Sequence, residues 1–158
     1  MLAELARRGF GTVSEPGRRI VTEELQGNGA ALPWVNLAAF AIRAIERAAL
    51  DRDRVAEERD WTFFDRGLVD AAVALQHATG QPASITLARY PRFHNRVFLT
   101  PPWPEIYVRD QERRHDMAEA IAEHDRLLLA YGELGYDPII LPKWPIVDRA
   151  HFVLRHLT

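Results

Sequence analysis

Helix-like and strand-like patterns of apolar residues alternate along the chain, and their order predicts the architecture. The longest helical stripe runs from residue 36 to about 58, with arginine and glutamate on its other face. Shorter helical patterns cover residues 2–9, 14–26, 68–79, 110–131 and 146–157. Compact apolar runs predict strands at residues 11–13, 61–64, 96–99 and 138–141. Because helices separate the strands, we expect an α/β fold with a parallel sheet, right-handed crossovers and helices on both faces.

Length and composition predict a single domain over residues 1–158, because the 158 residues suit one core and the loosest linker, residues 80–95, is too short to divide domains. The formal net charge of -2 argues against nucleic acid or anionic lipid as a partner. No apolar stretch reaches the ~20 residues of a membrane span. The chain has no cysteine, which excludes thiolate chemistry and fits a cytoplasmic location.

Charged residues follow the first predicted strand, at the edge where an open parallel sheet binds its ligands. Glu15 comes first, and Arg18 and Arg19 follow at the start of the next helix. A helix amino end and two guanidiniums together favour an anion. A helix-start acid beside two solvated arginines explains the same pattern without a ligand, and the spacing alone leaves both interpretations open.

A second charged group, Asp65 and Arg66, follows the second predicted strand, with Asp70 about one helical turn further on. An aspartate at this place suits Mg²⁺ bound through water, or acceptance of a proton from a substrate hydroxyl, while Arg66 suits a phosphate. An aspartate that caps the next helix beside a paired arginine fits the pattern equally well.

Arginines also gather at residues 109, 113 and 114, and the only lysine, Lys143, follows the last predicted strand. Guanidiniums on a mobile segment can stabilise the charge of a phosphoryl group in transfer. An exposed ion-pair face is the ordinary explanation of such a mixed-charge helix. The segment around Lys143 suits either the border of a base-binding slot or a rigid connector, because prolines flank it.

Four blocks of sequence resemble, in the same order, the P-loop NTPases of the nucleotide-kinase-like group, in particular the small AAA-type ATPases related to the kinase domain of NadR. The blocks are LARRGFGTVSEPGRRIVTEEL at 5–25, FFDRGLVDAAVAL at 63–75, RVFLTPPWPEIYVRDQERRH at 96–115 and YDPIILPK at 136–143. The resemblance implies a three-layer fold that binds ATP and Mg²⁺, and acts as an ATPase or a small-molecule kinase on an unknown acceptor.

The resemblance also implies roles for individual residues. In this assignment the two charged groups at the strand ends face the acceptor and supply the base. The arginines at 109, 113 and 114 belong to a lid over the nucleotide. The implied catalytic residues are Asp65, Glu15 and Arg113. The implied substrate-binding residues are Arg18, Arg19, Arg66 and Asp70. The implied nucleotide-binding residues are Arg109, Arg114 and Lys143, and Asp65 also holds Mg²⁺ through water.

One departure from the family pattern is large. The first strand and the Gly-x-x-x-x-Gly-Lys-[Ser/Thr] loop of these proteins are missing from the sequence, and Met1 aligns just beyond that loop. We expect a start placed too late, and the alternative is a degenerate, nucleotide-free interaction module. Either way, little activity is expected from these 158 residues.

The missing strand would lie at the centre of a sheet ordered 2-3-1-4-5. Without it, two strands face a gap, and each unpaired buried backbone group costs roughly 1 to 3 kcal/mol. We therefore expect the chain to close the gap, to form a homodimer or segment swap, or to be marginally stable.

Overall fold

A computed structural model describes residues 1–55, 60–106 and 117–157. The chain divides into two compact units, one spanning Leu2–Pro91 and the other comprising Met1 and Arg92–Thr158. The boundary falls inside the segment 80–95, which the sequence analysis judged too short to separate domains. Whether both units form the single domain expected from the length stays a prediction, and each unit is described by itself.

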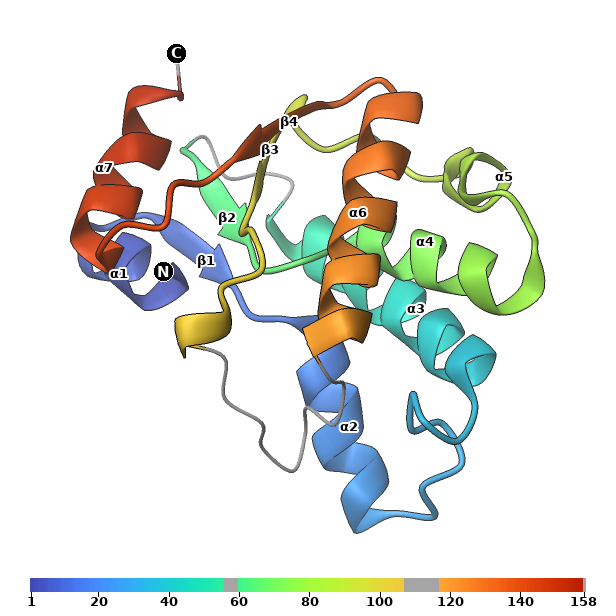
Figure 1. Cartoon of the computed structure of the whole chain (residues 1–158). Helices are drawn as coiled ribbons and strands as arrows, with labels where there is room; N and C mark the ends of the chain where they lie inside the picture. Colours follow the sequence, from blue (N-terminus) through green and yellow to red (C-terminus); the bar gives the residue numbers. More distant parts are fainter. Residues whose placement is uncertain (56–59, 107–116, 158) are drawn as a thin grey trace. The chain divides into compact units, whose positions relative to one another are not determined.

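The Leu2–Pro91 unit contains two short parallel strands and five helices in its described part (Figure 1). In β1 and β2, Gly11 pairs with Thr62, and Val13 pairs with Phe64. The parallel direction requires a crossover between the strands, and two helices supply it. The elements are α1 (Leu2–Arg7), β1 (Gly11–Val13), α2 (Pro16–Gln26), α3 (Leu37–Val55), β2 (Thr62–Phe64), α4 (Leu68–Thr79) and α5 (Ala83–Leu87).

The core of this unit lies where α3 packs against α2 and α4. Alanines at the buried positions of α3 let the helices approach closely, because a methyl group keeps the axes near the short end of their usual separation. Ile20 of α2 and Leu68 of α4 fill the space around them and are at most 2% exposed. Small residues on α3 and larger ones on its neighbours therefore fix the positions of α2 and α4, the two helices that begin just after the strands end.

A double ion pair tightens α1 at the start of the unit. Both Arg7 and Arg8 donate to Glu4 at 2.8 Å. The hydrogen bonds from Arg7 and then Arg8 lower the pKa of the Glu4 carboxyl to about 2. This carboxylate therefore stays charged at all physiological pH values.

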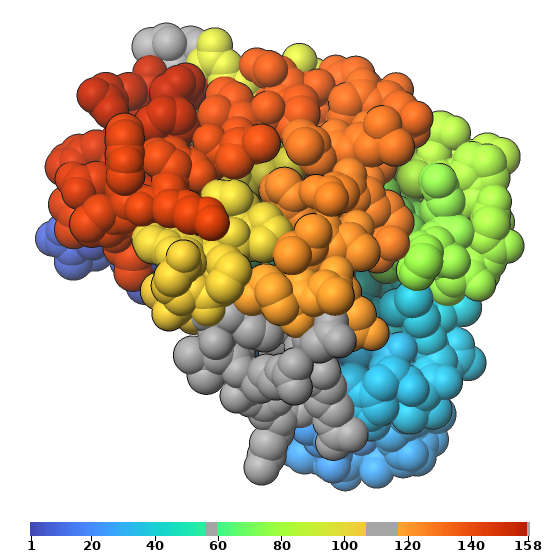
Figure 2. Space-filling view, viewed as in Figure 1, coloured from blue at the N-terminus to red at the C-terminus, as the bar shows by residue number. Residues whose placement is uncertain are grey.

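The second unit contains a further pair of parallel strands, in which Arg96 pairs with Asp137 and Leu99 with Ile140. Leu141 and Val153 are its largest fully buried side chains, each 1% exposed. Only Leu127 and Tyr131 of α6 are buried, and Figure 2 shows this helix in orange at the surface. The elements are β3 (Arg96–Leu99), the 3-10 turn η1 (Pro104–Ile106), α6 (Met117–Glu133), β4 (Asp137–Ile140) and α7 (Ile146–Arg155).

The described residues therefore form two two-stranded parallel sheets, β1 with β2 and β3 with β4. These are the neighbours that the order 2-3-1-4-5 leaves when its first strand is taken away. The mixed α/β class, the parallel strands and their alternation with helices are confirmed. The three-layer arrangement and the missing central strand stay predictions. None of the helices in the described part of the chain has the length and apolar character needed to cross a membrane.

Candidate functional site

The carboxyl ends of β1 and β2 bring three charged side chains together. Glu15 Oε1 lies 3.3 Å from Nε of Arg66, and Glu15 Oε2 lies 3.8 Å from Nε of Arg18. Glu15 is about one-quarter exposed, and both arginines are more than 40% exposed. We call these three residues the strand-end cluster. Two guanidiniums beside one carboxylate form a group that suits an anionic ligand.

The backbone places this cluster through the pairing of the two strands. The N–H of Asp65 donates to the carbonyl of Val13 at 2.9 Å, which extends the ladder by one residue and fixes where both strands end. Glu15 then precedes the first turn of α2. Gly17 lies in that turn, and a Cβ added to it would come within 2.9 Å of the Phe40 ring. The small residue therefore lets α2 start close against α3.

Arg66 has the left-handed backbone conformation, with a φ of 62°, and is the described non-glycine residue with positive φ. A residue with a Cβ pays roughly 1–2 kcal/mol for this conformation. Such strain is typical of positions where the direction of a side chain matters. Here the conformation lets the chain turn from β2 towards α4 while the guanidinium stays beside Glu15.

This strain predicts the order of stability of two variants. Arg66→Gly and Arg66→Ala both remove the side chain, but only glycine relaxes the backbone. We expect Arg66→Gly to be about 1 kcal/mol more stable than Arg66→Ala, measured by urea unfolding followed by circular dichroism. Equal stability of the two variants would show that the conformation at Arg66 carries no cost.

Arg19, the second arginine of the predicted anion site after the first strand, has a different partner. Its guanidinium is hydrogen-bonded to both carboxylate oxygens of Asp51 on α3, and it also donates to the carbonyl of Ser14 at 3.4 Å. Asp51 is 5% exposed, so the pair ties α2 to α3 inside the unit. The sequence analysis missed Asp51, although an acid on the apolar stripe of residues 36–58 was a signal for such a partner.

Asp70 lies at the start of α4, where its Oδ2 accepts a hydrogen bond from the N–H of Gly67 at 2.9 Å. This contact stabilises the first turn of the helix, as a capping acid does. The helix-capping alternative therefore applies to Asp70 rather than to Asp65. The substrate-binding roles of Arg19 and Asp70 stay predictions, and both side chains already serve local structure.

Asp65 is exposed and follows β2 directly. Among residues 1–55, 60–106 and 117–157, no three His, Cys, Asp or Glu residues gather in a way that could hold a metal ion. Mg²⁺ is commonly held by one or two carboxylates together with water and the phosphates of a nucleotide. Asp65 fits that shared mode of binding and does not fit a magnesium site made by the protein alone.

The remaining predicted residues lie elsewhere in the chain. Lys143 is exposed after β4 and belongs to the second unit. Arg109, Arg113 and Arg114 fall within 107–116, outside the described residues. The structure thus brings together Glu15, Arg18 and Arg66, with Asp65 next to Arg66 in the chain.

Comparison with known proteins identifies the family of the chain. A family model described as AAA domain matches residues 1–149. The chain belongs to the AAA domain family. AAA domains are P-loop proteins that generally bind a nucleotide with Mg²⁺, so nucleotide-binding activity in general is the function that the family indicates. No curated protein and no solved structure matches the chain significantly.

Proposed function

We propose that this AAA domain takes part in ATP-dependent phosphoryl transfer, as an ATPase or a small-molecule kinase of the NadR-like group, and that the strand-end cluster holds the acceptor. The observation that carries the proposal is the approach of Glu15 to Arg66 at 3.3 Å across the ends of two paired strands. In open parallel sheets, ligands bind at that edge. A carboxylate and a guanidinium that the sheet holds at this edge support a ligand-binding role.

The chemistry of the three side chains suggests a different role for each of them in binding the acceptor. Arg66 presents its guanidinium from a strained backbone, so it would grip a phosphate or carboxylate of the acceptor at a fixed point. Arg18 adds a second guanidinium, about equally exposed, from the first turn of α2. Glu15 orients both arginines and is within reach of a hydroxyl on the bound acceptor, where it or Asp65 would accept the proton.

These 158 residues contain only part of the proposed ATP-binding site. Asp65 suits the Mg²⁺ that accompanies the nucleotide, and Arg109, Arg113 and Arg114 are proposed to form the lid. No Gly-x-x-x-x-Gly-Lys-[Ser/Thr] sequence is present to cradle the phosphates. The residues present therefore fit the acceptor and the metal but not the phosphate chain, and we propose that the 158 residues alone have little activity.

The strand pairings support the same proposal. β2 has β1 as its one neighbour among the described residues, and β3 has β4. The two pairs correspond to the neighbours 2-3 and 4-5 in the strand order 2-3-1-4-5 of the NadR-like group, in which strand 1 leads into the phosphate loop.

Restoring the missing element tests the proposal. We expect the chain, extended ahead of Met1 by a strand and a Gly-x-x-x-x-Gly-Lys-Thr loop from another AAA domain, to bind MgATP with micromolar affinity in an isothermal titration. The backbone N–H groups and the lysine of the loop would supply the contacts to the phosphates. The matched control is the same extension with the loop lysine replaced by alanine.

A nucleotide-free interaction module is the second candidate, and the absent phosphate loop favours it. The proline-rich segment around Trp103 is the contact surface that the sequence suggested for such a module. In the second unit the Arg149 guanidinium lies 5.5 Å from the centroid of the Trp103 ring, and the ring is half-buried. This stacking supports a packing role for Trp103, so the candidate rests on the missing loop alone.

A further inference from the structure

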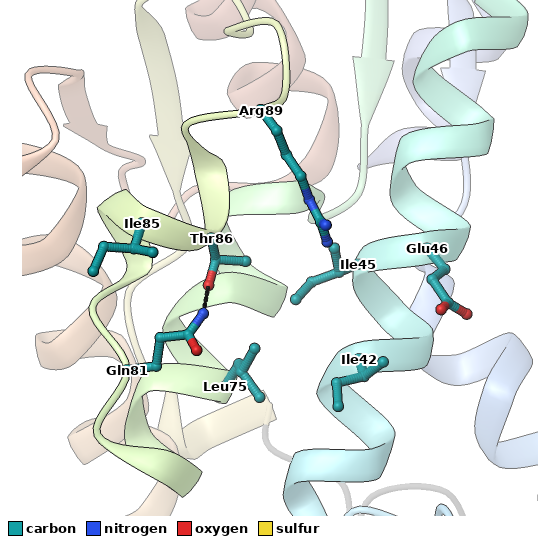
Figure 3. Close-up of a pocket in the computed structure, with 8 residues that line it drawn as sticks. All are labelled: Ile42, Ile45, Glu46, Leu75, Gln81, Ile85, Thr86 and Arg89. Carbon is teal, nitrogen blue, oxygen red and sulfur yellow. Dashed lines mark hydrogen bonds between the residues drawn. The ribbon is translucent and has the colours of Figure 1, made fainter.

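A small pocket lies at the opposite end of α4 from the strand-end cluster. α4 begins at Leu68 beside the cluster, and Leu75, seven residues on and so roughly 10 Å along the helix, lines the pocket. The pocket has a volume of about 260 Å³ and is formed by α3, α4 and the segment from Gln81 to Arg89 (Figure 3). It is therefore separate from the proposed acceptor site.

The floor and walls of the pocket are aliphatic. Ile45 and Leu75 form the floor and are 3% and 9% exposed. Ile42 and Ile85 stand on opposite walls and are 48% and 63% exposed, although both are large apolar side chains. Covering these two walls would remove apolar area from water, which favours an occupant with an aliphatic body.

The polar groups of the pocket are few and have different chemistry. The Arg89 side chain extends from the segment after α5 towards the pocket, above Ile45 in Figure 3. Its guanidinium stacks 5.0 Å from the centroid of the Tyr90 ring, and it has no carboxylate partner among the described residues. On the other side, Gln81 donates to Thr86 Oγ1 at 3.0 Å, which leaves the hydroxyl proton of Thr86 as a second donor.

We infer that this pocket is a binding site for a small aliphatic monocarboxylate. The aliphatic body would lie against Ile42, Ile45 and Ile85, and the carboxylate would pair with Arg89. A planar guanidinium binds a carboxylate through two parallel hydrogen bonds, and Arg89 is exposed, so its guanidinium is accessible to a ligand. The volume lies just below the range of pockets for drug-sized ligands, which restricts the occupant to a short chain.

The charges at the rim exclude more strongly charged ligands. Glu46 also lines the pocket, and its carboxylate points away from Arg89 in Figure 3. The described residues that line the pocket include a single guanidinium, which matches one carboxylate, and the nearby Glu46 carboxylate repels a polyphosphate with several negative charges. The site therefore selects a single negative charge and is distinct in chemistry from the strand-end cluster, where two arginines face one acid.

Titration of the chain with hexanoate, followed by ¹H–¹⁵N NMR, tests this site. We expect saturable shifts at the amides of Ile42, Leu75, Ile85 and Arg89, and about tenfold weaker binding of the neutral isostere hexanamide. Arg89→Met keeps the aliphatic stem and removes the charge, and it should weaken hexanoate binding by about ten- to a hundredfold. MgATP should cause no shifts at these amides.

Two variants serve as controls. Arg54→Met removes an arginine whose side chain is 71% exposed in the same unit but outside the pocket, and it should bind hexanoate normally. Ile85→Ser changes an exposed wall without disturbing the core, and it should weaken hexanoate several-fold. Equal binding of hexanoate and hexanamide, or no saturable shifts, would overturn the inference. It would also fail if the chain is a dimer by sedimentation and Ile85→Ser makes it a monomer, because a second copy would then be the occupant.

Discussion

Replacing Asp51 with alanine is expected to lower the free energy of unfolding of the chain by about 3 kcal/mol. Asp51 is 5% exposed and accepts hydrogen bonds from both terminal nitrogens of Arg19. Its loss leaves a guanidinium between α2 and α3 without its main partner, and breaking a buried ion pair costs roughly 3–5 kcal/mol. The lower end of that range applies because the Arg19 side chain is 32% exposed and water can reach it. Urea unfolding followed by circular dichroism measures the effect.

Matched variants separate the ion pair from a general effect of charge. Asp53→Ala removes an exposed acid two residues along α3 and should change stability by less than about 0.5 kcal/mol. The double variant Arg19→Met with Asp51→Leu replaces the pair by apolar side chains and should recover most of the loss. A loss of stability below about 0.5 kcal/mol for Asp51→Ala would contradict a structural role of the pair. Arg19 would then be a solvated arginine, as the ligand-free interpretation of the sequence has it.

The arginines of the proposed site should differ in which kinetic constant they change. In the chain extended with a phosphate loop, Arg66→Ala should raise the KM for the acceptor, because in the proposed site a guanidinium held at the end of β2 would contact the substrate before and during transfer. Arg113→Ala should lower kcat by on the order of 10²-fold with little change in ATP affinity, because a lid arginine contributes most when charge develops on the phosphoryl group. Steady-state kinetics with ATP and acceptor varied in turn measure both.

Arg54→Ala is the control for these kinetics, because Arg54 is highly exposed and pairs with Asp51 at 3.5 Å rather than with Glu15 of the strand-end cluster. It should leave both constants near those of the parent. Equal and small effects of Arg66→Ala and Arg113→Ala would mean that these arginines belong to a solvated surface.

Much of the fold could be predicted because strong local signals mark its boundaries. β1, α4 and β3 have the bounds that the apolar pattern predicted, and turn residues such as Gly80 end the runs sharply. The expected strand at 138–141 is shifted by one residue to Asp137–Ile140. Moving the ends of so short a strand by one residue leaves nearly the same apolar side chains in it. The short helix α5 had only a weak pattern, and its helical state depends on packing against α4.

The candidate site was predictable where strand order decides it. Glu15 and Arg66 lie 51 positions apart in the chain, and the rule that ligands bind at the carboxyl ends of parallel strands singled out each of them, while their contact follows from the pairing of β1 with β2. The position of Asp51 on an apolar stripe signals a buried acid, but the pattern does not say which cation it meets, because that depends on how α2 packs on α3. The left-handed backbone conformation of Arg66 could not be predicted from the sequence either, because arginine rarely adopts it.

The titration that most directly tests the account compares MgATP binding by three proteins: the 158-residue chain, the chain extended with a strand and phosphate loop, and the extended chain carrying Asp65→Asn. The account predicts micromolar binding by the extended chain, no binding of that strength by the 158 residues, and marked weakening by Asp65→Asn. A higher urea midpoint of the extended chain would show that the added strand has paired. An extended chain that folds with this gain in stability and yet binds no MgATP would contradict the proposal of an ATP-dependent phosphoryl-transfer protein.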